Sequence, residues 1–349
     1  MNSGVFYGIA SAVLFGVSTP LAKILVGSIP PLWLAALLYL GAGLGLFMVL
    51  GARRMFAPDA PVALPAARDW TWIGAAIGLG GVVGPIALMY GLTLTTAASA
   101  SLLLNLEAVL TALLAWFLFK ENFDRRIALG MLVIVAGAML LTVTPSGGQG
   151  SVLGSLLIVA ACLCWALDNN LTRKVSASDA VVLAAMKGLV AGSVSASLAL
   201  ALGTPIPPIP SIVRAAAVGF LGYGVSLVLF ILALRHLGTA RAGAYFSVAP
   251  FFGAVVAVLT GQDAMTWPLV AAATLMGLGV WLHVSEYHAH QHRHEPLVHT
   301  HAHAHDEHHG HELPDAGDGA EPHVHEHAHA PLRHSHPHFP DVHHRHSHG

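Results

Sequence analysis

The sequence predicts an all-α integral membrane protein with a separate polar tail, and three observations indicate this. The chain has 349 residues, of which 55% are hydrophobic and only 10% are charged. A soluble domain would carry roughly a quarter charged residues, because its surface faces water. Long apolar stretches recur before residue 288, and 22 of the 24 histidines lie at or beyond His288.

Ten stretches before the tail are long and apolar enough to cross a bilayer, which takes about 20 residues of helix. Proline-rich breaks such as Ser28–Pro31 and Thr204–Pro210 separate some of them, because proline lacks an amide proton and disfavours helix in the preceding residue. The predicted spans are Gly4–Val26, Leu32–Leu50, Thr71–Leu92, Ala97–Phe119, Ile127–Val143, Val152–Asn170, Ala180–Leu202, Ile212–Leu234, Ala240–Gly261 and Thr266–Val284.

Lysine and arginine fall almost entirely in alternate connections between these spans. The other connections hold almost none, apart from Arg214 at the edge of the eighth span. Basic connections stay in the cytoplasm, so we expect a multi-pass protein of the cell (inner) membrane with both termini cytoplasmic. The residues that set this orientation are Arg53, Arg54, Arg68, Lys120, Arg125, Arg126, Arg173, Lys174, Arg235 and Arg241.

The chain also repeats itself. Each half holds five spans, an odd number, so the two halves must have opposite orientations, as in many secondary transporters. The predicted domains are two five-helix repeats, 1–143 and 144–287, and the tail, 288–349. A shift of 150 residues places Phe15-Gly16 on Trp165-Ala166, Ser18 on Asp168 and Lys23 on Arg173, and a shift of 142 places Asn105–Ala108 on Ser247–Pro250 and Lys120-Glu121 on Gln262-Asp263.

The stretch from Ala98 to Trp116, followed by Lys120-Glu121, resembles the fourth-helix signature of EamA-type proteins of the drug/metabolite transporter superfamily. Two further segments of this chain are similar to other sequence features of the family, namely Phe15-Gly16 with Lys23 and the stretch from Arg235 to Pro250. The resemblance covers residues 4–284 and implies a ten-helix, 5+5 inverted-repeat fold that moves small solutes, often outward. Many members carry proline where Ala108 stands, and Glu107 beside it is a departure that leaves the substrate open.

Two charged residues within spans are candidates for the transport pathway. Glu107 lies near the middle of the fourth span, where a carboxylate costs several kcal/mol unless it faces a cavity or a partner. It could contact substrate, carry a proton or form a buried structural pair. Lys187 lies inside the seventh span and could neutralise Glu107, contact an anionic part of a substrate, or extend to the interface on its flexible stem.

Asp168, Asn169 and Asn170 cluster at the end of the sixth span that we expect to be cytoplasmic. They could line the inner mouth and offer oxygen atoms to a cation, or satisfy the backbone groups of a helix end. The predicted substrate pathway comprises Glu107, Lys187, Asn105, Asp168 and Asn169.

No motif of a hydrolase, a metalloprotease or a nucleotide-binding loop is present, which argues against an enzyme and against ATP-driven transport. Transport would then be driven by coupling to an ion gradient or by simple exchange, and we expect no cofactor to be required. The basic residues are dispersed, which argues against nucleic acid as a partner. Cys162 and Cys164 lie within an apolar run, and we expect them to pack in the core.

The tail carries too few apolar side chains to repay the entropy of ordering it, so we expect it to be disordered when free. Imidazole favours Zn, Ni, Co and Cu, and alternating histidines offer many equivalent ligand sets. A polycation that titrates near pH 6.5, or an inert segment, is the alternative. The predicted metal ligands are His301, His303, His305, His308, His309, His311, His323, His325, His327 and His329.

Together these features favour a secondary transporter that exports a small metabolite and carries a cytoplasmic metal-binding tail. One alternative is a divalent metal (Ni, Co or Zn) exporter that uses the tail as a buffer. Another is a metal-responsive membrane sensor that transports nothing and recruits a partner.

Overall fold

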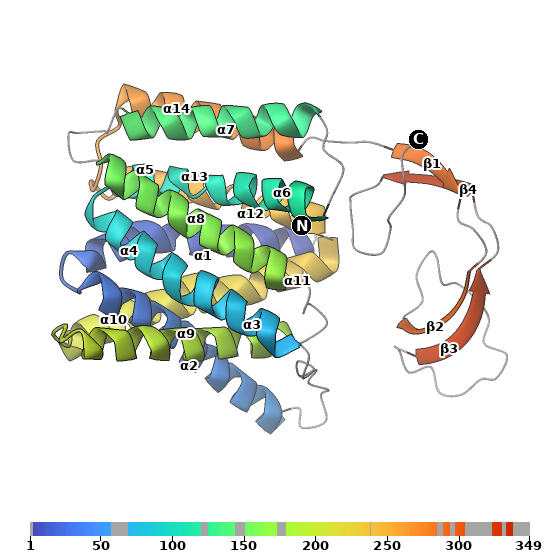
Figure 1. Cartoon of the computed structure of the whole chain (residues 1–349), viewed down its shortest axis with the longest axis horizontal. Helices are drawn as coiled ribbons and strands as arrows, with labels where there is room; N and C mark the ends of the chain where they lie inside the picture. The colour runs from blue at the N-terminus through green and yellow to red at the C-terminus, as the bar shows by residue number, and fades with distance from the viewer. Residues whose placement is uncertain are drawn as a thin grey trace. The chain divides into compact units, whose positions relative to one another are not determined.

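The computed structural model describes residues 3–56, 69–119, 125–143, 151–172, 179–237 and 239–284, and four short segments of the tail. The chain divides into two compact units, residues 1–286 and residues 287–349. The described part of the first unit is helical throughout and forms the helical body (Figure 1).

The helices fall where the sequence predicts spans. Among the described residues, seven helical runs are long and apolar enough to cross a membrane, and the shorter apolar helices are Ala128–Val143, Ala249–Leu259 and Trp267–Leu282. The elements are α1 (Ser3–Val26), α2 (Pro31–Phe56), α3 (Trp70–Ala76), η2 (Ile77–Val83), α4 (Gly84–Thr93), α5 (Ala97–Leu103), α6 (Leu106–Phe119), α7 (Arg125–Val143), α8 (Val152–Thr172), α9 (Ala180–Ala201), α10 (Ile209–Gly219), η5 (Phe220–Val225), α11 (Ser226–Leu237), α12 (Thr239–Phe246), α13 (Ala249–Leu259) and α14 (Trp267–Val284).

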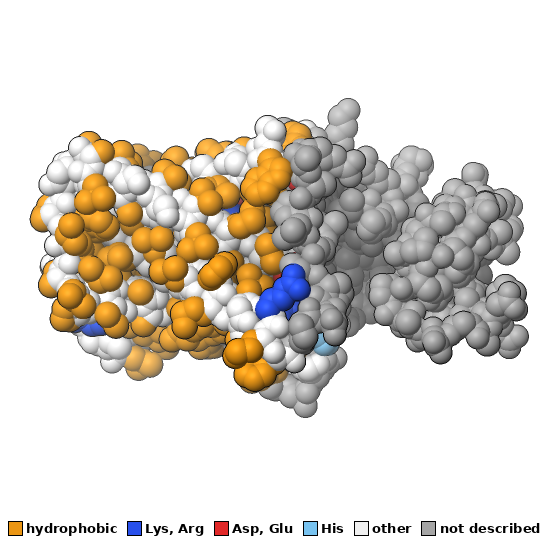
Figure 2. Space-filling model, turned by 90° about the horizontal axis from the view of Figure 1, so that it is seen from below, with side chains coloured by type: hydrophobic (Ala, Val, Ile, Leu, Met, Phe, Trp, Pro, Cys, Tyr) orange, Lys and Arg blue, Asp and Glu red, His pale blue; other side chains and the backbone are white. Residues whose placement is uncertain are grey.

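The outer surface of the helical body is apolar. Phe47, Met48 and Trp281 each expose more than 60% of their surface, and hydrophobic side chains are spread over the whole of the described face in Figure 2. Exposed apolar area on this scale marks a surface that contacts lipid or another apolar partner. Helices suit lipid because they satisfy their own backbone hydrogen bonds.

The body has two chemically different ends. At one, which we call the short-turn end, the connections 27–30, 94–96, 202–208 and 260–266 join consecutive helices. The other, which we call the basic end, carries Arg53 and Arg54 at the end of α2, and Arg125 and Arg126 at the start of α7. The short-turn end lies to the left in Figure 1 and the basic end to the right.

Glycine allows the closest helix contacts in the body. α2 packs along α9, and a Cβ added to Gly43 or Gly188 would collide with the backbone of the opposite helix. α7 packs along α14, where a Cβ on Gly279 would collide with Gly130. Small residues are what allow helix backbones to approach this closely within a membrane.

Two helical runs contain π-helical segments, which the sequence did not predict as interruptions. In η2 the amide of Gly84 donates to the carbonyl of Leu79, five residues back. In η5 the amide of Ser226 makes the same kind of bond to Leu221. Such segments often occur at functional sites.

The fourth and ninth predicted spans are each two consecutive helices. α5 and α6 are separated at Leu104 and Asn105, and the Asn105 side-chain amide donates to the carbonyl of Leu102 at 3.0 Å. α12 and α13 are separated at Ser247 and Val248. Pro250, in the first turn of α13, has no amide proton and cannot continue the preceding helix.

The described part of the tail contains four short strands. β1 (Ala289–Arg293) pairs antiparallel with β4 (Arg333–Pro337), and β2 (Leu297–His303) pairs antiparallel with β3 (His323–His329). The second register sets His301 opposite His325 and His303 opposite His323. An isolated two-stranded ribbon is only marginally stable in water, so disorder of the free tail stays a prediction.

Candidate functional site

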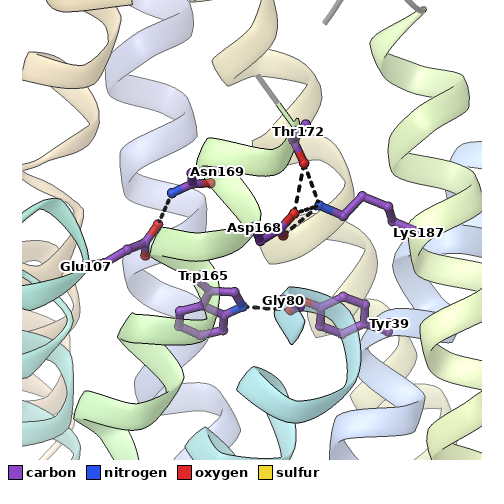
Figure 3. A network of polar contacts seen from close by, with 8 residues as sticks. All are labelled: Tyr39, Gly80, Glu107, Trp165, Asp168, Asn169, Thr172 and Lys187. Atoms are coloured by element: carbon purple, nitrogen blue, oxygen red, sulfur yellow. Dashed lines mark hydrogen bonds and ion pairs between the residues drawn. The ribbon is translucent and has the colours of Figure 1, made fainter. Parts of the chain in front are cut away.

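A buried ion pair joins α8 to α9. The Lys187 ammonium lies 2.6 Å from each carboxylate oxygen of Asp168, and the two side chains are 16% and 10% exposed. The Thr172 hydroxyl, one helical turn beyond Asp168, donates to the same carboxylate at 2.8 Å. These three side chains converge in Figure 3. The charge of Asp168 is therefore balanced where it is buried.

Glu107 lies beside this pair with a different partner. It stands in the first turn of α6, directly after the helix break, and its Oε1 accepts a hydrogen bond from the Asn169 amide at 2.9 Å (Figure 3). A carboxylate in the first turn is favoured by the helix dipole. Glu107 is half-buried and Asn169 is exposed. Among the described residues, no cation forms an ion pair with Glu107.

The third part of the network is the backbone carbonyl of Gly80 in η2. It accepts a hydrogen bond from the Tyr39 hydroxyl of α2 and another from the Trp165 indole of α8, both at 2.9 Å (Figure 3). An α-helical carbonyl would accept from residue 84, but that amide is bonded to Leu79. Pro85, the next residue, has no amide proton. The two side chains therefore replace the helical donors of Gly80.

Gly80 also allows η2 to lie against the ion pair. A Cβ on Gly80 would collide with the Asp168 carboxylate. The network thus links α2, η2, α6, α8 and α9 around residues that come from both halves of the sequence.

A row of aromatic rings meets this network at Tyr39. The Tyr39 ring lies 5.7 Å from that of Tyr223 in η5, which lies 5.8 Å from Phe15 in α1. Phe246 of α12 lies 5.3 Å from Phe15. The row therefore extends from the polar network across α1, α2, η5 and α12.

The predicted pathway residues divide into two groups. The structure brings together Glu107, Asp168, Asn169 and Lys187, but it pairs Lys187 with Asp168 and not with Glu107. Asn105 is buried and turned into the helix break, with its amide on the Leu102 carbonyl and 3.9 Å from the sulfur of Met276.

Asn170 is likewise bonded within its own helix, to the Ala166 carbonyl at 2.8 Å. Among the three neighbours singled out in the sequence, only Asp168 and Asn169 point into the network.

Sequence reasoning missed Tyr39, Gly80, Trp165 and Thr172. The internal repeat aligns Trp165 with Phe15, but this alignment does not indicate that the Trp165 indole donates a hydrogen bond to Gly80. Pro85 has no amide proton, so the Gly84-Pro85 step does indicate that a carbonyl in the preceding turn lacks a backbone donor. No sequence signal distinguishes Tyr39 from other tyrosines or Thr172 from other threonines.

Among the described residues, no group of three or more His, Cys, Asp or Glu side chains is placed to hold a metal ion. Cys162 and Cys164 are free thiols buried in α8, and the Cys162 sulfur lies 3.7 Å from the carbonyl of Leu103. Of the predicted tail ligands, His301 and His303 lie in β2, while His323, His325, His327 and His329 lie in β3. The others, His305, His308, His309 and His311, lie outside the described residues.

The EamA-like transporter family model matches residues 2–143 and again residues 152–285. The chain belongs to the EamA-like transporter family. An uncharacterized transporter of Methanothermobacter thermautotrophicus is 28% identical over 292 residues, covering 78% of this chain and 84% of the relative. The uncharacterized inner membrane transporter YedA of Escherichia coli is 26% identical and covers 71% of this chain and 78% of the relative.

The fold is also found in a solved structure. A crystal structure matches with a TM-score of 0.60 at 22% identity, covering 80% of this chain and 96% of that one. The EamA resemblance noted in the sequence is thus confirmed, and the chain is a multi-pass membrane transporter of that family.

Proposed function

We propose that this transporter is a secondary exporter of a small metabolite, with ten spanning helices arranged as a 5+5 inverted repeat. The pattern of helix packing supports the repeat. α1 packs against α11 and α13, and α8, its counterpart five spans later, packs against α4 and α6. The π-helical segments and the helix breaks also fall in corresponding spans of the two halves. Discontinuous helices at such positions form the central sites of many secondary transporters.

The basic end is the cytoplasmic one in this proposal. Arginines at the ends of α2 and at the start of α7 follow the rule that positive residues stay inside. Both termini then lie in the cytoplasm, and the short-turn end faces outward.

The single observation that carries the proposed function is the state of Glu107. It is a carboxylate within an apolar helical body, half-buried, bonded to a neutral amide and without an ion-pair partner among the described residues. An intramembrane carboxylate of this kind is costly and usually serves transport. Lys187 already forms an ion pair with Asp168, so it does not balance the charge of Glu107.

Glu107 therefore contacts a cationic or hydrogen-bond-donating part of the solute, or carries a proton exchanged for it. Asn169 orients the carboxylate, and the Asp168–Lys187 pair fixes α8 to α9 beside it. Transport then draws on an ion gradient or on exchange.

Export can be tested without knowing the cargo. Cells that express the wild-type chain, the Glu107→Gln variant or an empty vector are compared at equal membrane amounts, and small solutes in the medium are profiled by mass spectrometry. We expect at least one solute to accumulate with the wild type and to fall by about tenfold or more with Glu107→Gln, the effect of about 1.4 kcal/mol. Ser195→Ala, a buried neutral change in α9, is the matched control. Equal profiles for wild type and Glu107→Gln would contradict the proposal.

The tail is proposed as an accessory metal buffer that binds Zn, Ni, Co or Cu. Its support is the spacing of the histidines and the register that sets histidine opposite histidine in β2 and β3. A chain ending at residue 287 should export the same solute and bind less metal, as measured by equilibrium dialysis.

A divalent metal exporter is the second candidate function, favoured only by the tail. In the part of the body that the structure describes, no chelating group is assembled, so we favour a metabolite. Cell metal content that rises when the full-length gene is deleted, and falls again when residues 1–287 are supplied, would support the metal exporter instead. Absence of flux of any solute would support a sensor.

A further inference from the structure

The short-turn end is held together by two charged side chains that bind backbone groups. The ammonium of Lys23 in α1 donates to the Leu92 carbonyl in the last turn of α4, at 2.6 Å. The carboxylate of Asp263 in the 260–266 turn accepts from the Ala98 amide in the first turn of α5, at 2.5 Å. A cation at a helix C-terminus and an anion at an N-terminus each complement the helix dipole.

The turn between α4 and α5 is also fixed by the start of α8. The Ser151 amide donates to the Leu94 carbonyl at 2.9 Å. A Cβ on Gly154 would collide with the Thr95 hydroxyl. Residues 92–98 are thus bound by α1, by the 260–266 turn and by α8, elements that come from both halves of the chain.

The helix behind this turn is enclosed. All seven residues of α5 are buried, although Ser99 and Ser101 are polar. A Cβ on Gly253 of α13 would collide with Ser101 and with the Gly16 backbone, so α1, α5 and α13 are in close contact here. Among the described residues, α5 is therefore tightly enclosed by its neighbours at this end.

Several polar atoms are buried at this end without a hydrogen-bond partner, namely the hydroxyls of Thr95, Ser99 and Ser101 and the side-chain oxygen of Gln262. An unsatisfied buried polar group costs free energy that access to water would return. The closed arrangement is therefore opposed by these atoms and favoured by the contacts of Lys23 and Asp263.

We infer that Lys23 and Asp263 are the latch of an outer gate, and that the gate opens by releasing the α4–α5 turn and wetting the α5 hydroxyls. The inference rests on the proposed alternating transport and adds residues to which that proposal assigns no role. Glu107 lies beyond the other end of α5 from the latch, after the helix break, so the latch contacts do not involve it.

The latch is tested by labelling Ser101→Cys with a membrane-impermeant thiol reagent from outside intact cells, in a background of Cys162→Ala and Cys164→Ala. Loss of a hydrogen bond to a charged group is expected to raise the labelling rate about tenfold in Lys23→Met and in Asp263→Asn. Arg214→Met is the matched control, because Arg214 carries a charge near the same end and, among the described residues, bonds only within α10, to Pro210 and Ser211. Equal rates in all four chains, or full labelling without a latch mutation, would overturn the inference.

A cross-link across the Asp263 contact keeps the inference testable if Lys23→Met fails to fold. Linking Ala98→Cys to Asp263→Cys with a short reducible reagent should abolish export, and reduction should restore it. Undiminished export by the linked protein would overturn the latch. Labelling does not depend on cargo, so a latch that responds as expected while Glu107→Gln exports normally would contradict the proposed function and leave the latch standing.

Discussion

The two halves of the body use the same backbone contact with different chemistry. Gly80 in η2 lies against Asp168 of α8, and Gly222 in η5 lies against Ser18 of α1; a Cβ on either glycine would collide with its neighbour. Asp168 forms an ion pair with Lys187, whereas the Ser18 hydroxyl donates to Phe15 within its own helix at 2.6 Å. The residue that lies against the glycine is therefore charged in the second half, where it is Asp168, and neutral in the first half, where it is Ser18. The backbone geometry follows the proposed repeat, while the location of the polar site depends on residues that depart from it.

The largest expected difference between the halves is the response to removing a charge. Lys187→Met leaves Asp168 buried without its charged partner, with only the Thr172 hydrogen bond among the described residues, and should lower the free energy of unfolding by about 3 kcal/mol. Ser18→Ala, at the related position, should cost about 1 kcal/mol, since it removes only hydrogen bonds of a neutral hydroxyl, those with Phe15 and Tyr223. Unfolding of the purified protein in mixed detergent micelles measures both. The double variant Asp168→Asn with Lys187→Met should regain most of the loss. Equal stability of Lys187→Met and wild type would show that the pair is unimportant.

The next difference concerns the two glycines. Gly80→Ala forces a methyl group onto the Asp168 carboxylate and should cost about 1–3 kcal/mol, as overpacking does. Gly222→Ala should cost less, because Ser18 carries no charge whose position matters. Gly78→Ala in the same π-helical segment is the control, since nothing lies within 4 Å of its added Cβ. If Gly78→Ala and Gly80→Ala unfold alike, the close contact in η2 has been misjudged.

The smallest effects are expected at the Gly80 carbonyl, where two donors share one acceptor. Trp165→Phe or Tyr39→Phe alone should cost less than about 1 kcal/mol, because the other donor remains. The double variant leaves the carbonyl without a donor and should cost about 1–3 kcal/mol, more than the sum of the single changes. Additive single and double effects would mean that the carbonyl finds another partner. Phe15, related to Trp165 by the repeat, has no N–H, so Phe15→Leu tests packing alone.

Much of the helical body could be predicted from the sequence because charge-free length and proline position are local signals. The Thr93–Thr96 step carries neither a charge nor a proline and gave a weaker signal, yet α5 begins at Ala97 as predicted. The family resemblance came from a different signal, the residues from Ala98 to Trp116. The four polar residues that assemble were also visible, since an intramembrane charge is rare. Their partners were not, because the choice of Asp168 over Glu107 by Lys187 depends on how α8 and α9 pack.

The interruptions were harder to predict, although their causes lie in the sequence. Pro250 explains the break before α13, but Ala108 stands at the related position of the first half, and there Asn105 bonds the Leu102 carbonyl through its side chain. At Gly80, Pro85 removes one backbone donor, and the donors that compensate come from helices distant in sequence. Hydrogen bonds between helices that are distant in the sequence leave no periodic pattern of residue types from which they could be predicted.

The claim that the two halves have opposite orientations is tested most directly by determining on which side of the membrane two helix ends lie. Gly51→Cys near the end of α2 and Leu202→Cys just after α9 both occupy exposed positions at the ends of corresponding spans. In a background without Cys162 and Cys164, a membrane-impermeant maleimide should label Leu202→Cys on intact cells and Gly51→Cys only after permeabilisation. Labelling of both positions from the same side would contradict the inverted repeat and the transport path built on it.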